Sequence, residues 1–352
     1  MALLRQTSPH THAPLGTPAV MQLVLLALIP GICTQLYFFG WGVLTNIVLA
    51  SIFALALEAA FMALRRRPVV FYLRDFSALV TAVLLAIAMP PASPWWLILV
   101  GILFAIGVAK HLYGGLGYNP FNPAMVGYVV LLISFPVEMT RWLTPVTVLP
   151  SGIEASSLAD TLRLVAGMTP AHSLDALTMA TPLDVLRQNK SLMIDDLWQA
   201  NLQFGRFAGV GWEWVNVAYL AGGVFLLWRK IYTWHAPLSM LGTLALMSLL
   251  FYDGGSSASH GSPMFHLFSG ATMLGAFFIV TDPVTSAVSN RGRLIYGAAI
   301  GVLLFVIRSW GNYPDAMAFA VLLMNFSAPF IDHYTQPRTF GHQTKSQKRE
   351  DQ

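Results

Sequence analysis

Residues 42 to 67 read GVLTNIVLASIFALALEAAFMALRRR, an apolar run that contains one charged residue, Glu58, before it ends in three arginines. A helix needs about 20 mostly apolar residues to cross roughly 30 Å of hydrocarbon, so residues 42 to 64 are long enough to span a bilayer. The whole chain of 352 residues is 56% hydrophobic and only 10% charged, with a mean hydropathy of +0.62. Soluble domains carry about 25% charged residues. The sequence therefore predicts an all-α integral membrane protein.

Apolar segments of similar length recur along the chain and predict about ten transmembrane helices. They lie near residues 21–41, 42–64, 76–92, 95–113, 122–139, 211–229, 234–252, 264–282, 292–309 and 315–333. The chain then divides into a membrane half (1–139), a polar segment (140–210), a second membrane half (211–334) and a tail (335–352). With about five spans in each half, any duplication has to be a 5+5 inverted repeat, a plan common in transporters.

Lysine and arginine lie in alternate connections, which predicts the orientation because positively charged short loops stay in the cytoplasm. These residues are Arg5, Arg65, Arg66, Arg67, Arg74, Lys110, Arg229, Lys230, Arg291, Arg293, Arg338, Lys345, Lys348 and Arg349. Both termini are therefore expected in the cytoplasm, with residues 140–210 in the periplasm. Arg308 is the exception. The net charge of +4 reflects this asymmetry, and nothing indicates a nucleic-acid partner.

Two predicted spans contain segments rich in glycine, proline and polar residues: YGGLGYNPFNPAMVG (113–127) and FSGATMLGAFFIVTDPVTSA (268–287). A helix that breaks in lipid persists only where protein or a cavity satisfies its backbone. In the first segment, Gly115 and Gly117 would let the backbone approach a flat ring, and Asn119 and Asn122 would supply amide hydrogen bonds. A turn that serves only helix packing fits the same composition.

Several chemistries are excluded by the sequence. The single cysteine, Cys33, has no partner for a disulfide or a cysteine-ligated cluster held by this chain alone. No nucleotide-binding, metalloprotease or catalytic-triad motif is present. His10 and His12 are interpreted as solvated, so no metal site is expected. Glu58 fits either an ion path or a carboxylate paired within the protein.

The stretch HSLDALTMATPLD (172–184) is polar and places Thr178 and Thr181 behind Asp175. On local pattern alone, Thr181 fits a simple turn before Pro182.

Six stretches together resemble one family: SPHTH, LYGGLGYNPFNPAMVGYVVLLISFPVEMT, MATPLD, FSGATMLGAFFIVTDPVTS, NRGRLIYGA and IRSWGNYPD. The sequence resembles the NqrB/RnfD family over nearly its whole length. This family contains RnfD (RsxD), the D component of the Rnf electron-transport complex, and the B component of the sodium-pumping NADH:quinone reductase.

The resemblance implies FMN joined through its phosphate to a threonine in a D-x-x-(S/T)-G-A-T segment, installed by an external flavin transferase. Asp175, Thr178 and Thr181 match that segment, with methionine at the glycine position. A second Ala-Thr pair, ending at Thr272, has the glycine but carries His266 in place of the aspartate. Thr272 also lies inside a predicted span, so Thr181 is the expected attachment residue.

The resemblance also implies a non-covalent riboflavin, for which the turn at Gly115, Gly117, Asn119 and Asn122 is the candidate site. It further implies a role in a bacterial inner-membrane complex that couples electron transfer from NADH or ferredoxin to movement of H⁺ or Na⁺. The expected partners are the other Rnf subunits, especially the neighbouring flavin-bearing and membrane subunits, and membrane lipid. A flavin moves one or two electrons while the protein holds it and tunes it.

The alternative interpretation is a secondary transporter or channel without flavin, which the layout of two halves and broken helices also fits. A purely structural scaffold subunit is a third interpretation.

Overall fold

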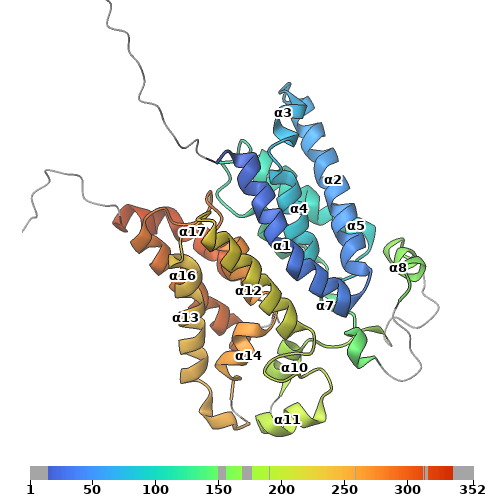
Figure 1. Ribbon diagram of the computed structural model, residues 1–352, viewed down its shortest axis with the longest axis vertical. Coiled ribbons are helices and arrows are strands. Elements are labelled where there is room, and N and C mark those ends of the chain that lie inside the picture. Colours follow the sequence, from blue (N-terminus) through green and yellow to red (C-terminus); the bar gives the residue numbers. More distant parts are fainter. Residues whose placement is uncertain are drawn as a thin grey trace, which may run out of the picture.

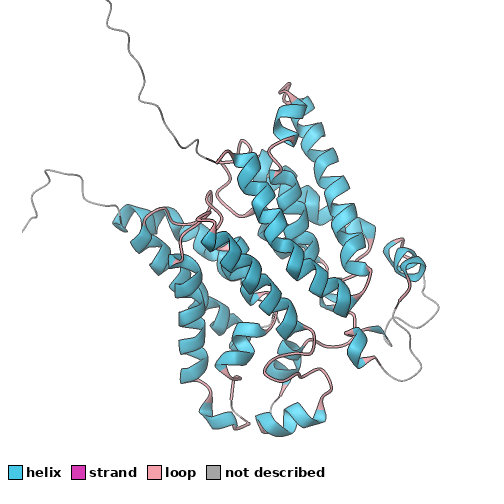
Figure 2. Ribbon diagram, in the orientation of Figure 1, coloured by secondary structure: helices cyan, strands magenta, loops and turns pink. Residues whose placement is uncertain are grey.

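The computed structural model describes residues 15–149, 156–168, 177–189, 191–257, 259–311, 313 and 316–335. Within these ranges the regular structure is helical, and strand-like pairing is limited to two isolated bridges. Figure 2 shows helices joined by loops. The predicted all-α fold is confirmed.

The N-terminal half contains two long helices followed by shorter ones. They are α1 (Thr17–Phe39), α2 (Gly42–Leu64), α3 (Val69–Leu73), α4 (Ser77–Ala88), α5 (Trp95–Ile102), η1 (Leu103–His111) and α6 (Pro123–Ser134). The π-helix η1 continues α5 directly, and Asn122 caps α6 with its side chain.

The connecting segment, residues 140–210, is bordered by α7 and contains only short helices in its described parts. These are α7 (Pro136–Thr140), η2 (Val146–Val148), α8 (Leu158–Val165), α10 (Pro182–Gln188) and α11 (Ile194–Ala200).

The C-terminal half again combines long and short helices. They are α12 (Trp212–Trp228), α13 (His235–Leu250), η3 (Asp253–Gly255), α14 (Pro263–Phe268), α15 (Thr272–Leu274), η4 (Gly275–Ile279), α16 (Asn290–Trp310) and α17 (Met317–Thr335).

Among the described residues, three helices are long and apolar enough to cross a membrane: α1, α2 and α16. Four shorter apolar helices accompany them: α4, α5 with η1, α6 and α13. The chain leaves the helical region at Phe135 (φ −134°), so the span expected at 122–139 is divided between α6 and α7. Gly270 (φ 58°) separates α14 from α15 within the span expected at 264–282. Both expected spans are therefore built from shorter pieces.

The two halves lie side by side and contact one another through matching pairs of helices. Figure 1 shows the first half in blue and cyan beside the second half in yellow to red. α1 packs along α12, and α6 packs against α17, while α13 and α16 pack together within the second half. The core is thus shared between the halves, because buried residues of both belong to one hydrophobic cluster.

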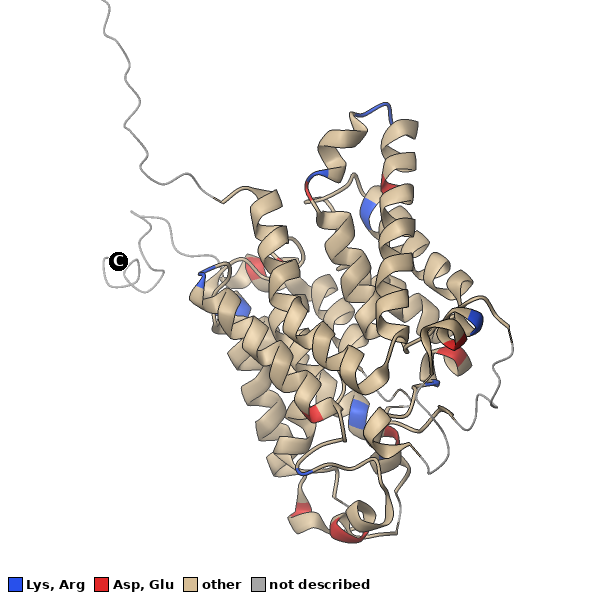
Figure 3. Ribbon diagram, turned by 45° about the vertical axis from the view of Figure 1, so that its right-hand side comes forward, with Lys and Arg blue, Asp and Glu red and all other residues tan. Residues whose placement is uncertain are grey.

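Charged residues lie mainly at helix ends and in the connecting segment (Figure 3). Arg308, the exception to the charge pattern, is buried at the end of α16 with 4% of its surface exposed. Its guanidinium donates to the carbonyl oxygens of His266 (3.0 Å) and Ser269 (3.4 Å), at the break between α14 and α15. Arg308 is therefore an internal structural cation, and the loop-charge rule does not apply to it.

Two glycines one turn apart let α16 approach α13 closely. A Cβ atom at Gly297 would overlap the carbonyl oxygen of Ala236, and one at Gly301 would overlap the carbonyl oxygen of Met240. Small residues at this spacing are a common device for packing helices in membranes, where close van der Waals contact replaces the hydrophobic effect.

We predict that Gly301→Ala destabilises the protein, because the added methyl group pushes α16 away from the α13 backbone. Overpacking of this kind costs about 1–3 kcal/mol. The measurement is the thermal unfolding temperature of the purified protein in detergent. Gly242→Ala is the matched control, because a Cβ there meets nothing within 4 Å. Equal unfolding temperatures for the two variants would contradict the packing account.

Candidate functional site

A short antiparallel pairing fixes the connecting segment in front of Thr181. Leu143 and Thr178 form an isolated bridge. The Thr144 amide donates to Leu177 O (2.9 Å), and the Met179 amide donates to Trp142 O (3.0 Å). Thr178 therefore helps to position Thr181 through its backbone, while Asp175 lies outside the described residues.

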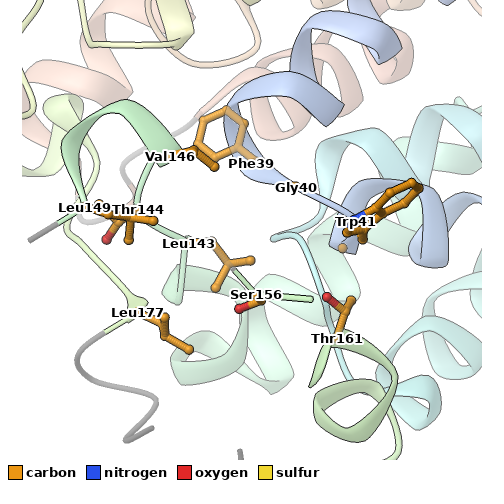
Figure 4. A pocket seen from close by; sticks show the side chains of 11 residues that line it. Phe39, Gly40, Trp41, Leu143, Thr144, Val146, Leu149, Ser156, Thr161 and Leu177 are labelled. Carbon is orange, nitrogen blue, oxygen red and sulfur yellow. The ribbon is translucent and has the colours of Figure 1, made fainter. Parts of the chain in front are cut away.

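A cavity of about 350 Å³ lies where this pairing meets the turn between α1 and α2. Figure 4 shows Phe39 near Val146, with Leu143, Leu177 and Thr161 around the same space. Its lining is mostly apolar, with three threonine or serine hydroxyls. This cavity marks the place where the connecting segment packs on the membrane half.

Thr181 is the N-cap of α10. Its hydroxyl donates to Asp184 Oδ2 (2.7 Å) and accepts from the Asp184 amide (3.3 Å). Arg187 Nη2 lies 3.5 Å from Asp184 Oδ1. The other terminal nitrogen of Arg187, Nη1, is buried and has no hydrogen-bond partner among the described residues. The threonine oxygen is thus held beside one carboxylate and one guanidinium with donor capacity to spare.

An aromatic cavity lies beside Thr181. It measures about 430 Å³, and its walls include Tyr128, Trp142, Trp212 and Gly270. The Trp142 and Trp212 rings meet edge-on, with their centroids 4.7 Å apart. Sites for flat organic cofactors are typically concave, largely apolar and aromatic, and of this order of size. Thr181 therefore borders a space that fits a ring system.

Thr272, the competing threonine, is fully buried. Its hydroxyl donates to His266 O (2.9 Å) and Ser269 O (2.8 Å) at the helix break. This oxygen satisfies carbonyl groups that the break would otherwise leave unpaired. The neighbouring Gly270, however, lines the same aromatic cavity as Thr181, so the two Ala-Thr segments lie close together in the fold.

The glycine and asparagine turn lies at a contact between the two halves. Gly115 (φ 107°) and Gly117 (φ 90°) need glycine for their backbone angles, and a Cβ at either would meet nothing within 4 Å. Asn119 is buried, and its Oδ1 has no hydrogen-bond partner among the described residues. Asn122 caps α6 by accepting from the Met125 amide (3.2 Å).

A buried charge network was only half visible in the sequence. Glu58 Oε1 binds Lys110 Nζ (2.9 Å), and Glu58 Oε2 lies 2.9 Å from His111 Nε2. Lys110 also donates to Ser77 Oγ (2.8 Å) at the start of α4. The sequence counted Lys110 as a loop cation, but it is 2% exposed. Of the two interpretations of Glu58, the structure shows internal pairing.

The described residues contain no group of three histidine, cysteine or acidic side chains close enough to hold a metal ion. His10 and His12 lie outside the part of the chain that the structure describes.

The fold and the helix composition define an integral membrane protein. Within that class, the chain belongs to the NQR2, RnfD, RnfE family, which it matches over residues 4–341. The predicted family is confirmed.

Curated relatives align over nearly their full length, and all carry the name of the D component of an ion-translocating oxidoreductase complex. The relative from Pseudomonas aeruginosa (strain LESB58) is 60% identical over 342 residues, covering 97% of each chain. The relative from Cellvibrio japonicus (strain Ueda107) is 59% identical over 345 residues, covering 97% of this chain and 96% of its own. The relative from Vibrio cholerae serotype O1 (strain ATCC 39541 / Classical Ogawa 395 / O395) is 52% identical over 357 residues, covering 97% of this chain and 100% of its own.

We predict that Lys110→Met destabilises the protein by about 3–5 kcal/mol, because it leaves the Glu58 carboxylate buried without its ammonium partner. The double variant Glu58→Gln/Lys110→Met removes both charges and should regain most of the loss. Unfolding temperatures in one detergent provide the comparison. A double variant as unstable as the single one would show that the ion pair is not what the site requires.

Proposed function

We propose that the chain is the membrane subunit of a complex that couples electron transfer to ion translocation, and that it carries FMN esterified to Thr181. Its membership of the family and the name shared by its relatives support the first part. The observation that supports the second is the position of the Thr181 hydroxyl at the edge of an aromatic cavity.

The residues around Thr181 fit the two parts of FMN. Trp142, Trp212 and Tyr128 offer aromatic surface for a flat ring. The unpaired Arg187 Nη1 can donate to a phosphodiester oxygen, and its positive charge offsets the negative charge added beside Asp184. The orphaned guanidinium nitrogen therefore gains an acceptor when the ester forms.

In the attachment step, Thr181 Oγ forms a bond to phosphorus, the bond from phosphorus to the donor's leaving group breaks, and the hydroxyl proton departs. Asp184 Oδ2 already accepts that proton in a hydrogen bond of 2.7 Å, so it is placed to take it up as a base. The external flavin transferase supplies the activated flavin nucleotide. Once bound, the flavin supplies one- or two-electron transfer, and the chain's aromatic walls keep water away from it.

We propose a bacterial inner-membrane location with both termini cytoplasmic and residues 140–210 periplasmic. The alternation of Lys and Arg between connections supports this orientation, and burial of Arg308 removes the one exception. The 5+5 inverted arrangement is part of the proposal. The pairing of the first helices of each half, α1 with α12, and of the last, α6 with α17, supports it.

A second flavin, non-covalent riboflavin, is proposed at the turn formed by Gly115, Gly117, Asn119 and Asn122. The buried, unpartnered Oδ1 of Asn119 supports this site, because such an oxygen in a native protein usually has a partner. The open space beside both glycines supports it as well.

The attachment residue is tested by producing variants together with a flavin transferase and recording in-gel flavin fluorescence after denaturation. Thr181→Asn should be dark, because asparagine keeps the N-cap of α10 but has no hydroxyl to esterify. Thr181→Ser should retain signal, because its hydroxyl remains. Asp184→Asn should label more slowly, because the proton acceptor is lost.

Thr272→Val and Thr178→Val are the matched controls, since each removes the hydroxyl of another threonine in the two candidate segments. Both should fluoresce as the wild type does. A dark Thr272→Val beside a fluorescent Thr181→Asn would move the attachment to Thr272. A wild-type chain that carries no flavin would favour the transporter interpretation.

The riboflavin site is tested with Asn119→Leu, which removes the unpartnered amide and keeps the bulk of the side chain. The purified complex should lose extractable riboflavin and keep its covalent fluorescent band. Asn122→Ser is the control, because serine preserves the cap of α6, and it should lose less riboflavin. Unchanged riboflavin in Asn119→Leu would return this segment to a packing role.

A further inference from the structure

Two polar atoms are buried without a partner in an inner cavity that adjoins the one beside Thr181. Tyr219 on α12 is 1% exposed, and its hydroxyl makes no hydrogen bond among the described residues. Gln35 on α1 is 4% exposed, and its Oε1 is likewise unpartnered. Both residues line a cavity of about 310 Å³.

Such a pair requires an explanation, because a buried donor or acceptor without a partner loses its hydration and gains nothing in return. Native proteins keep few such groups. Here two of them, from different halves of the chain, line the same space. A ligand that reaches the cavity is the simplest source of the missing hydrogen bonds.

The chemistry of the missing partner follows from how the two groups are held. The amide nitrogen of Gln35 donates to Ile87 O (3.2 Å), which leaves Oε1 as an acceptor for the cavity. The Tyr219 hydroxyl can donate. The ligand edge that satisfies both groups therefore combines an N–H with a carbonyl oxygen.

An imide edge has this combination, and the pyrimidine end of a flavin ring is one, with its N3–H between two carbonyl groups. A quinone offers carbonyl oxygens without an N–H, so it would satisfy Tyr219 and leave Gln35 unpaired. The pair of groups thus favours a flavin over a quinone as the occupant.

The route from Thr181 to this edge is continuous in its lining. Trp142, Trp212 and Gly270 line both the cavity beside Thr181 and the inner cavity. Gly270 contributes no side chain to the wall at that position, and its φ of 58° is one that glycine adopts readily.

We infer that Gln35 and Tyr219 bind the pyrimidine edge of the flavin attached at Thr181, with the ring between the shared tryptophan walls. This inference rests on the proposed function. It assigns the two residues a tuning role: a hydroxyl that donates to a ring carbonyl binds the reduced, more electron-rich ring more tightly than the oxidised one.

The test uses the full chain with its covalent flavin, and the readouts are the two-electron midpoint potential and the visible absorption spectrum. The Thr181→Asn chain serves as the blank, so that only the covalent flavin contributes. Tyr219→Phe removes one oxygen and keeps the ring. If the hydroxyl favours the reduced flavin tenfold, the potential should fall by about 30 mV, while in-gel fluorescence stays unchanged.

Gln35→Met should also alter the potential and the spectrum, because the acceptor for N3–H is lost. Tyr232→Phe is the matched control: its hydroxyl donates to Gly223 O (3.0 Å) and does not line either cavity. Its potential should equal that of the wild type.

The outcomes separate this inference from the function on which it rests. If Tyr219→Phe and Gln35→Met keep the covalent flavin with the wild-type potential and spectrum, the inference is wrong and the attachment at Thr181 stands. If Thr181→Asn still carries covalent flavin, the attachment itself is wrong. A shift of equal size in Tyr232→Phe would also overturn the inference, because the effect would then be general.

Discussion

A helix that breaks inside a membrane has to bind its free backbone groups to other parts of the protein, since lipid offers them no partner. The break between α14 and α15 meets this requirement with side chains from two other helices. Asn216 donates to the carbonyl oxygens of Phe268 (3.0 Å) and Gly270 (2.9 Å), and it accepts from the Met273 amide (3.0 Å). Arg308 binds further carbonyl oxygens from the other side. The break is therefore a built feature, fixed by α12 and α16 together.

The position of the aromatic cavity follows from this break. Because Asn216 holds Gly270 against α12, the bare backbone of Gly270 forms wall in a region where a continuous helix would place side chains. Trp212, at the start of the same helix, forms the opposite part of the lining with Trp142. Trp142 in turn accepts a hydrogen bond from the Met179 amide, two residues before Thr181. One set of backbone constraints thus brings the polar segment and the membrane half to the same cavity.

The sequence predicted the membrane class and the broken segments, because hydropathy and helix-breaking residues are local properties. It could not separate loop cations from buried ones, since Lys110 and Arg308 owe their burial to partners far away in the chain, Glu58 and the α14–α15 break. Nor could it foresee that helices end early, because a left-handed residue such as Phe76 (φ 62°) leaves no mark in a hydropathy window. For the candidate site, sequence pattern selected Thr181. It missed Asp184 and Arg187 as its companions and the orphan pair formed by Gln35 and Tyr219, which only packing reveals.

The arrangement of that orphan pair depends on two glycines where α1 meets α12. A Cβ at Gly31 would overlap the Tyr219 ring, and a Cβ at Gly222 would overlap the carbonyl oxygen of Ala27. Gly31 lies one helical turn before Gln35 on the same face of α1, and Gly222 lies one turn after Tyr219 on α12. The absence of side chains at these two positions lets the helices approach until the tyrosine and the glutamine line the same cavity. Close packing between the two halves, which in lipid relies on small residues, is therefore also what sets the hydrogen-bonding edge of the inner cavity.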